Sequence, residues 1–290
     1  MNCIALPATF LLAAATLLAA PQRLHAQASE LPSAAPTAAN QSDTERGRQL
    51  IDQMVAALGG EAWLNRATIQ IDGRGSAFFH GEPNPYISEY HEAVRYARPN
   101  ATPPVTFADR VGFLTERGMI LPGKKIDVVQ IWTKGNGYEV TYKGQTTLPK
   151  DQVEDYYRRR AHSTETVVHD WLKAPGVMVV AEGTVMVERR LADRVSVLTA
   201  NNDAVTIDLD AATHLPIRRT FRSRNAQFND YDEDAESYDD YHTIQGLPTP
   251  MTITRYHNGD MAGQRYYTKV VYNLPMDPSL FDPSVALKKK

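Results

Sequence analysis

Between residues 67 and 273 the sequence repeatedly alternates apolar and polar side chains with a period of two. This period is typical of half-buried β-strands, in which successive side chains point to opposite faces. Turn-forming sequences such as Gly135-Asn136-Gly137 and Asn201-Asn202-Asp203 separate the alternating runs. The runs span residues 69–79, 86–96, 105–115, 126–133, 138–142, 177–188, 194–199, 205–209, 215–224, 237–245, 251–257 and 265–273. So many strands joined by short turns predict one meandering antiparallel sheet.

Two segments instead carry apolar residues at helical spacing. Residues 43–58 follow Ser42, which has the Ser-x-x-Glu spacing of a capping box with Glu45, and residues 61–65 add a turn that presents Trp63. Residues 148–172 also have a helical pattern, with an expected break near residues 162–164. Because a large sheet with one apolar face needs a cover, these segments are the candidates for it. The predicted fold class is mainly β with a helical cover (α+β).

The N-terminal residues have the pattern of an export signal. The stretch from Ile4 to Ala20 is apolar, and Ala26-Gln27-Ala28 has the spacing of small residues that precedes signal cleavage. A membrane anchor is the alternative, although the stretch is short for a span and contains Pro7. We therefore expect secretion across the inner membrane into the periplasm, as a protein that is soluble after signal cleavage and has no stable membrane span. The expected organisation is a signal peptide over residues 1–28, a flexible leader over 29–42, a single domain over 43–285 and a basic tail over 286–290.

Composition excludes several classes of protein. Lys and Arg total 31 against 34 Asp and Glu, and the net charge of -3 is too balanced for binding nucleic acid or an anionic membrane through bulk charge. The only cysteine, Cys3, precedes the apolar stretch of the predicted signal, so we expect neither a disulfide framework nor lipidation of the mature chain. A partner must therefore be recognised locally.

The C-terminal third has a distinctive series of strand spacings and turns, in residues 193–197, 205–210, 213–218, 238–241, 246–253 and 272–281. This series resembles the bacterial lipoprotein-localisation superfamily (LolA/LolB-like). The end of the first predicted helix, Ala57-Leu58-Gly59-Gly60, is similar to that of secreted outer-membrane lipoprotein-sorting proteins. The resemblance implies an incomplete antiparallel β-barrel, or half-barrel, with lid helices across its open side and an apolar cavity for acyl chains. It does not account for residues 80–175, and the missing lipobox argues against a lipid-anchored receptor.

No motif of catalysis or metal binding is visible in the sequence. Gly73-Arg74-Gly75-Ser76 lies within strand alternation, whereas a nucleophile elbow needs a strand-to-helix turn. The histidines do not have the spacing of metal ligands. We therefore expect no enzyme activity, no cofactor and no metal site.

An acidic run over residues 230–240 has two interpretations. Its Asp-x-Asp-x-Asp start is similar to a calcium loop, but Ala235 stands where the turn glycine belongs and Tyr241 where the closing glutamate belongs. The preceding strand is rich in arginine, so a hairpin could set opposite charges against each other. We favour the charge-paired hairpin, with a weak calcium site as the alternative.

The candidate ligand-binding residues lie on the predicted inward faces of the strands and the first helices. Arg219 and Arg255 share these faces with apolar side chains such as Ile217 and Ile253. Because a buried guanidinium is costly unless it is paired, each arginine either forms an internal ion pair or snorkels, or else meets the polar end of an otherwise apolar ligand. The apolar candidates, which either pack as core or line a cavity, are Trp63, Phe79, Tyr90, Val94, Trp132, Val179 and Val185.

These observations predict a periplasmic, non-enzymatic binding or carrier protein whose partner is a hydrophobic ligand. The ligand is an acyl chain, a lipid or a lipoprotein held by burial of apolar surface. One alternative is an envelope sensor or interaction module that uses the same half-barrel to bind an envelope protein. A second alternative is an enzyme that acts on a hydrophobic substrate inside the cavity.

Overall fold

The computed structural model describes residues 41–84, 87–116, 124–225, 227–285 and 287. The predicted signal peptide, Cys3, leader residues 29–40 and Tyr86 of the predicted second strand lie outside the described residues, as does the predicted basic tail apart from Leu287. No helix among the described residues is long and apolar enough to cross a membrane.

The helices are α1 (Gln41–Leu58), α2 (Glu61–Leu64), α3 (Lys150–Ala161) and α4 (Thr164–His169), with 3-10 turns η1 (Trp171–Lys173) and η2 (Pro278–Phe281). The strands of the first half are β1 (Thr68–Phe79), β2 (Glu82–Pro83), β3 (Ser88–Arg95), β4 (Ala108–Glu116), β5 (Lys124–Thr133), β6 (Asn136–Thr141) and β7 (Gly144–Thr147). Those of the second half are β8 (Met178–Val187), β9 (Arg190–Leu198), β10 (Ala204–Asp210), β11 (Pro216–Asn225), β12 (Asp230–Ile244), β13 (Leu247–His257) and β14 (Asp260–Tyr272).

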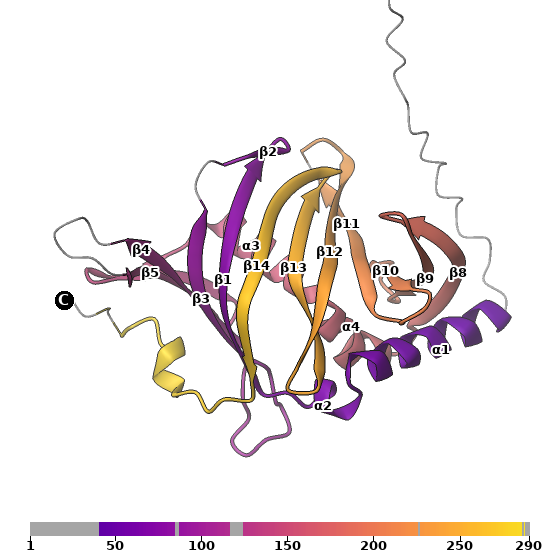
Figure 1. The fold of residues 1–290 in the computed structure, drawn as a ribbon, viewed down its shortest axis with the longest axis horizontal. Coiled ribbons are helices and arrows are strands. Elements are labelled where there is room, and N and C mark those ends of the chain that lie inside the picture. The colour runs from indigo at the N-terminus through magenta and orange to yellow at the C-terminus, as the bar shows by residue number, and fades with distance from the viewer. Residues whose placement is uncertain (1–40, 85–86, 117–123, 226, 286, 288–290) are drawn as a thin grey trace, which may run out of the picture. The chain divides into compact units, whose positions relative to one another are not determined.

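The strands form one antiparallel sheet of 14 strands (Figure 1). Its order is β7-β6-β5-β4-β3-β1-β14-β13-β12-β11-β10-β9-β8, with β2 paired to the end of β1. Over the described residues β7 and β8 are the two edges and do not pair with each other. The sheet is therefore an open half-barrel with a few helices, which confirms the predicted fold class.

The first and last strands join the two halves of the sheet. Ile69 lies opposite Tyr272 and Ile71 opposite Val270, and a bulge follows at Asp72. Immediately after the bulge, a Cβ on Gly73 would lie 2.6 Å from the hydroxyl oxygen of Tyr90 on the neighbouring strand β3. The lack of a side chain at residue 73 therefore lets the Tyr90 ring lie across the sheet at this point.

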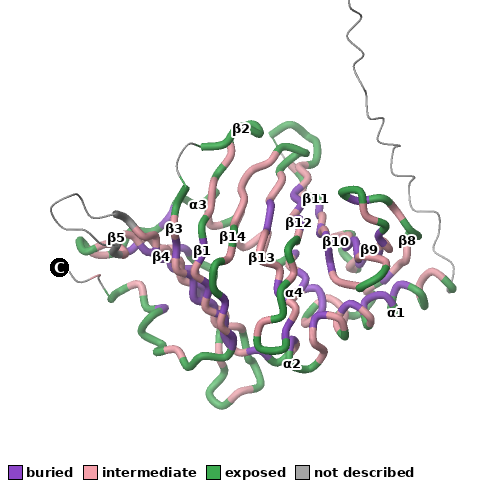
Figure 2. The backbone as a smooth tube through the Cα atoms, viewed as in Figure 1, coloured by how far each residue is buried: buried purple, intermediate pink, exposed green. Residues whose placement is uncertain are grey.

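Helix α1 covers β8 and β9 at one end of the sheet. Leu50, Ile51, Met54 and Leu58 are buried on one face of the helix, as its helical spacing predicts (Figure 2). A Cβ on Gly47 would lie 2.9 Å from the backbone nitrogen of Ala181, so the helix backbone packs directly on strand β8.

The ends of α1 differ in how well the sequence predicts them. The helix ends as expected, at Gly59 and Gly60, which both adopt positive φ angles of 117° and 57°. It begins at Gln41, so Ser42 lies inside the helix and not at its N-cap, and the last two residues of the predicted leader are helical. The capping-box prediction is therefore wrong.

Helices α3 and α4 connect the edge strands β7 and β8 and break where the sequence predicts. Ser163 is the N-cap of α4, and its hydroxyl oxygen accepts a hydrogen bond from the backbone nitrogen of Thr166 at 3.2 Å. Val167 and Val168 of α4 are buried, whereas α3 has no buried residue. The two helices therefore attach to the sheet by different kinds of contact.

The acidic run forms a charge-paired strand. β12 begins at Asp230, seven residues before the predicted strand, and pairs with the arginine-rich β11. Arg222 contacts Glu233 at 2.9 Å, and Arg219 contacts Glu236 at 2.9 Å. No group of three or more His, Cys, Asp or Glu side chains in the described part of the chain is placed to hold a metal ion. The acidic run is therefore an extended, charge-paired strand, as the favoured interpretation predicts.

Candidate functional site

A cavity of about 740 Å³ lies between one face of the sheet and the helices α2, α3 and α4. This volume falls in the range of about 300–1,000 Å³ that small-molecule sites occupy. Aromatic and aliphatic side chains supply much of its wall: Leu58, Trp63, Ile69, Ile71, Val94, Phe107, Val111, Phe113, Trp132 and Ile253. The cavity can therefore take up an apolar molecule.

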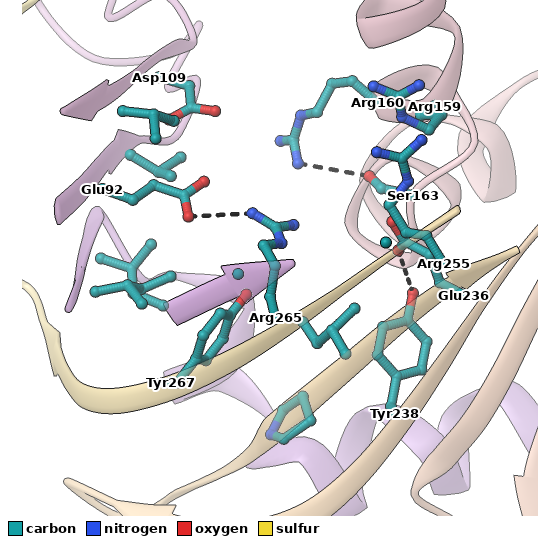
Figure 3. Close-up of a pocket in the computed structure, with 18 of the residues that line it drawn as sticks. Glu92, Asp109, Arg159, Arg160, Ser163, Glu236, Tyr238, Arg255, Arg265 and Tyr267 are labelled. Carbon is teal, nitrogen blue, oxygen red and sulfur yellow. Dashed lines mark hydrogen bonds and ion pairs between the residues drawn. The ribbon is translucent and has the colours of Figure 1, made fainter. Parts of the chain in front are cut away.

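Charged side chains also line the cavity, although charged residues are seldom found inside a protein. Six arginines and four carboxylates contribute to the described wall: Arg66, Arg159, Arg160, Arg219, Arg255, Arg265, Glu92, Asp109, Glu165 and Glu236. Figure 3 shows Arg159, Arg160 and Arg255 on one side, Glu92 and Asp109 on the other, and Arg265 reaching toward Glu92. The ligands that the cavity can bind depend on which of these charges already have an ion-pair partner in the protein.

Arg265 and Glu92 form one matched pair in the wall. The Arg265 Nη1 lies 3.2 Å from Glu92 Oε2, and Glu92 is only 6% exposed. Burial disfavours the charge of Arg265, but the neighbouring Tyr267 and Glu92 together hold its pKa well above the ordinary value. This pair ties β14 to β3 across the intervening strand β1.

Arg66 and Glu165 form a second matched pair, which joins the start of the sheet to α4. Arg66 Nη2 donates to Glu165 Oε1 at 2.5 Å, and the Arg66 guanidinium lies 4.4 Å from the centre of the Trp63 ring. Arg160 approaches the same glutamate at 3.8 Å and lies over the Phe107 ring at 4.2 Å. Burial opposes ionisation of Glu165, but Arg66 and Arg160 lower its pKa.

Arg219 is held inside the protein. It is 2% exposed, and its Nη2 lies 2.9 Å from Glu236 Oε2. Its Nη1 donates to the backbone oxygens of His162 at 2.5 Å and Arg159 at 3.3 Å, at the end of α3. Burial opposes ionisation of Glu236, but Arg219 lowers its pKa to about 2. Arg219 therefore fastens α3 to the sheet through an internal ion pair, the first of the two interpretations that its pattern allows.

Arg255 differs from Arg219 although both share the predicted face. It lies opposite Glu236 in the β12–β13 register, yet its side chain has no hydrogen bond or ion pair with any described residue. Burial lowers the pKa of Arg255; Arg265 and Arg219 add to this effect and Glu236 opposes it. Arg255 is half-buried and lines the cavity without an ion-pair partner, so a ligand in the cavity can satisfy its charge.

Asp109 is a cavity residue that the sequence analysis missed. Its Oδ2 accepts a hydrogen bond from the Tyr156 hydroxyl at 2.7 Å, while its buried Oδ1 has no partner. Burial, with a further contribution from Glu92, raises the pKa of Asp109 to about 8. The Tyr156 ring stacks on Trp132 with 4.0 Å between ring centres. Asp109 is therefore largely a neutral acid at neutral pH and helps to hold α3 on the sheet.

The same pattern that singled out Arg219 and Arg255 could have found the other cavity charges. Asp109 lies two residues from Phe107 and from Val111, and Glu92 lies two residues from Tyr90 and from Val94. In each case an ionisable side chain shares a strand face with apolar neighbours.

The structure brings six of the nine predicted site residues to the cavity wall: Trp63, Tyr90, Val94, Trp132, Arg219 and Arg255. Phe79 does not line it, because it lies at the far end of β1 and is 77% exposed. Val179 is buried on β8 next to α1, so it is core. Val185 packs with Val187, Ala192 and Ile217 in a separate cluster. The inward face of β8 therefore meets packed side chains and not the cavity.

No protein-family model matches the sequence, and no curated protein matches it. Solved structures do match the fold. A DUF1329 family protein from Desulfovibrio piger has 9% identity and a TM-score of 0.54, over 83% of this chain and 97% of that chain. A domain described as an outer membrane lipoprotein-sorting protein from Vibrio parahaemolyticus has 8% identity and a TM-score of 0.51, over 82% of this chain and 97% of that chain. The chain therefore shares the fold of these two proteins.

Proposed function

We propose that this protein is a non-enzymatic binding or carrier protein of the periplasm that holds an acyl chain or a lipid in the cavity beneath α3 and α4. The observation that carries the proposal is the cavity itself. Its volume of about 740 Å³ and its aromatic and aliphatic wall suit an extended apolar chain. The likeness to a lipoprotein-sorting domain supports the same class of ligand.

Burial of apolar surface would supply the affinity. Each methylene group removed from water contributes about 0.8 kcal/mol. The dissociation constant should therefore fall by roughly fourfold for each methylene added to the chain, until the cavity is full. This dependence on chain length separates a lipid site from a surface that binds detergents weakly.

The test has two parts. Protein purified without detergent is extracted with organic solvent, and the extract is examined for co-purified lipid by mass spectrometry. Delipidated protein is then titrated with decanoate, dodecanoate, tetradecanoate and palmitate. We expect bound lipid and affinity that rises along the series. Protein that carries no lipid and shows no saturable binding would contradict the proposal.

A pair of tryptophan variants locates the binding site. Val111→Trp adds a bulky ring to the cavity wall and should weaken binding of the longest chains first. Leu191→Trp adds the same ring at a side chain that is 60% exposed, outside the cavity, and should leave binding unchanged. Circular dichroism checks that both variants fold. Equal binding by both would place the ligand elsewhere.

The same titrations separate the alternative functions. A sensor or interaction module would yield lipid-free protein that captures an envelope protein on crosslinking. An enzyme would change the mass of the added lipid during incubation. A carrier should return the lipid unaltered after extraction.

The periplasmic location rests on the N-terminal pattern, together with the proposed division into a signal over residues 1–28, a leader, one domain over 43–285 and a basic tail. N-terminal sequencing of exported protein should find Ser29 as the first residue. An uncleaved N-terminus retained in the membrane fraction would support the anchor alternative.

A further inference from the structure

A row of three charged residues crosses the cavity wall on adjacent strands. In the strand register, Arg219 of β11 lies opposite Glu236 of β12, and Glu236 lies opposite Arg255 of β13. One carboxylate therefore stands between two guanidinium groups. The row carries one positive charge more than it can pair internally.

The single carboxylate of this row, that of Glu236, already pairs with Arg219. Glu236 Oε2 lies 2.9 Å from Arg219 Nη2 and accepts a hydrogen bond from the Tyr238 hydroxyl at 3.0 Å. Arg219 is locked in place by the two backbone oxygens at the end of α3, so it cannot exchange places with Arg255. The unmatched charge thus resides on Arg255.

A second cation approaches Arg255 from helix α3. Figure 3 shows Arg159 on the same side of the cavity as Arg255. Burial lowers the pKa of Arg159 to about 10, and the positive charge of Arg255 is the next largest cause. The ion-pair partner of Arg159 is Asp155, one turn earlier on the same helix, which does not line the cavity. Two guanidinium groups, one on helix α3 and one on strand β13, therefore lie on the same side of the cavity, and their positive charges repel each other.

The space beside Arg255 is open. Its neighbour on β14 is Gly263, which in turn lies opposite Ala77 of β1. A Cβ placed on Gly263 would meet only the backbone oxygen of Ser76, at 3.6 Å. The wall next to the unmatched arginine is thus built from residues with little or no side chain, which leaves room for a bound group.

We propose that Arg255 and Arg159 bind the anionic head group of an amphiphile whose apolar chain occupies the rest of the cavity. This inference rests on the proposed function. A carboxylate or a phosphate monoester has the charge and the paired oxygens that guanidinium groups bind through two parallel hydrogen bonds. The bound anion supplies the missing negative charge and links the lid helix α3 to strand β13.

The experiment compares three ligands of equal chain length: palmitate, hexadecyl phosphate and hexadecanol. Dissociation constants are measured for the wild-type protein, for Arg255→Met and for Arg159→Met. Wild-type protein should bind the two anions at least about tenfold more tightly than the alcohol, as expected for hydrogen bonds to a charged group. Each variant should lose this preference and keep the affinity for hexadecanol.

Control variants separate the site from general effects of charge. Arg74→Met removes an arginine whose side chain is 60% exposed and pairs with Glu89 outside the cavity, so it should change none of the three affinities. Arg255→Lys keeps the charge but loses the planar fork, and should retain only part of the preference. Thermal melts without ligand confirm that each variant is folded.

Each outcome bears on one of the two proposals. If none of the three ligands binds, the carrier function itself fails. If all three bind equally, and Arg255→Met changes nothing, the carrier stands and the head-group site is overturned. If acetate or inorganic phosphate binds as tightly as the amphiphiles, the site is one for a free anion, and the inference of an amphiphile is overturned.

Discussion

At the scale of single residues, the cavity is defined by how each buried charge is satisfied. Arg219 and Arg255 occupy equivalent positions on either side of Glu236, but only Arg219 has the glutamate and two backbone oxygens as partners. The two residues therefore have different roles: Arg219 maintains the structure, and Arg255 is available to a ligand.

This difference predicts opposite effects on stability. Arg219→Met removes the buried member of the ion pair with the half-buried Glu236 and should lower the free energy of unfolding by up to about 3–5 kcal/mol, the range for loss of one member of a buried pair. Arg255→Met removes a charge that has no partner, so the ligand-free protein should keep its stability or gain some. Urea denaturation measures both variants. Equal losses in the two variants would show that Arg255 is also structural.

Asp109 predicts a dependence of stability on pH. Its pKa is about 8 in the folded protein against an ordinary value of 3.8, so the folded state binds a proton that the unfolded state releases. This contribution is complete below the ordinary pKa and is lost as the pH rises through the folded value. The free energy of unfolding should therefore fall between about pH 6.5 and about pH 9, by at least ~1.4 kcal/mol, the value of one pKa unit.

Asp109→Asn provides the matched control, since its neutral amide oxygen can still accept the Tyr156 hydrogen bond. The variant should lose the fall in stability over this range of pH. Parallel curves for the two proteins in urea titrations would mean that another group causes the dependence.

At the scale of elements, α1 and α3 cover the sheet in different ways. α1 buries a continuous apolar face, whereas α3 has no buried residue. α3 is attached instead mainly by polar side-chain contacts, with Tyr156 to Asp109 at 2.7 Å and the Tyr157 hydroxyl to the Asn136 backbone oxygen at 3.1 Å, and by one ring stack between Tyr156 and Trp132. Polar attachments at a solvent-facing helix resist opening less than apolar burial does.

We therefore expect α3 to open before α1. Backbone amides of residues 150–161 should exchange with deuterium faster than those of residues 50–58, by at least about tenfold, which corresponds to ~1.4 kcal/mol of local stability. Hydrogen exchange followed by mass spectrometry measures both peptides. Palmitate should slow exchange in α3 if the bound head group links it to β13. Equal protection of the two helices without ligand would contradict the difference in attachment.

Helix α1 contains a glycine, Gly47, that we expect alanine to replace only with a loss of stability. Alanine favours a helix by about 1 kcal/mol over glycine at most interior positions. At residue 47 its Cβ would lie 2.9–3.0 Å from the backbone of β8, which cannot move aside as a side chain can. Gly47→Ala should therefore lower the free energy of unfolding by roughly 1–3 kcal/mol. As a control, Ala56→Gly on the exposed face should cost only the helix propensity of about 1 kcal/mol.

At the scale of the whole sheet, the pairing of β1 with β14 determines how the chain unfolds. It joins strands from the two ends of the described chain, and α1 lies against β8 and β9 of the second half. Neither half can complete its part of the sheet alone. We expect one cooperative unfolding transition, with the same midpoint by tryptophan fluorescence and by far-ultraviolet circular dichroism.

Val270→Ala tests this coupling, because Val270 is buried at the β1–β14 junction. It should lower the common midpoint of both signals and reduce stability by about 1–3 kcal/mol. Lys269→Ala, at an exposed neighbouring position, should change stability by no more than about 0.5 kcal/mol. Two separate transitions in either protein would show that the halves unfold independently.

The sequence by itself determined which segments form strands and helices. Alternation of period two is a local property of the chain, so the strands around Ile71 and Ile253 can be predicted without knowledge of their partners. The break before α4 follows in the same way from Ser163 and its neighbours, and the resemblance adds the half-barrel. Where a strong local signal was absent the prediction failed, as for the short edge strand β7. The charge-paired hairpin of the acidic run was predicted, but the start of β12 was placed seven residues too late.

Only the tertiary structure decided what each inward-facing residue meets. Alternation assigns Arg219 and Arg255 to one face, but the strand register and the end of α3 determine which of them receives Glu236 and the backbone oxygens. In the same way, the cover of α1 over β8 makes Val179 core, whereas Val94 borders the cavity. The physical reason is that the local backbone determines the face of the sheet to which a side chain points. The groups that pair with that side chain, or cover it, come from residues distant in the sequence.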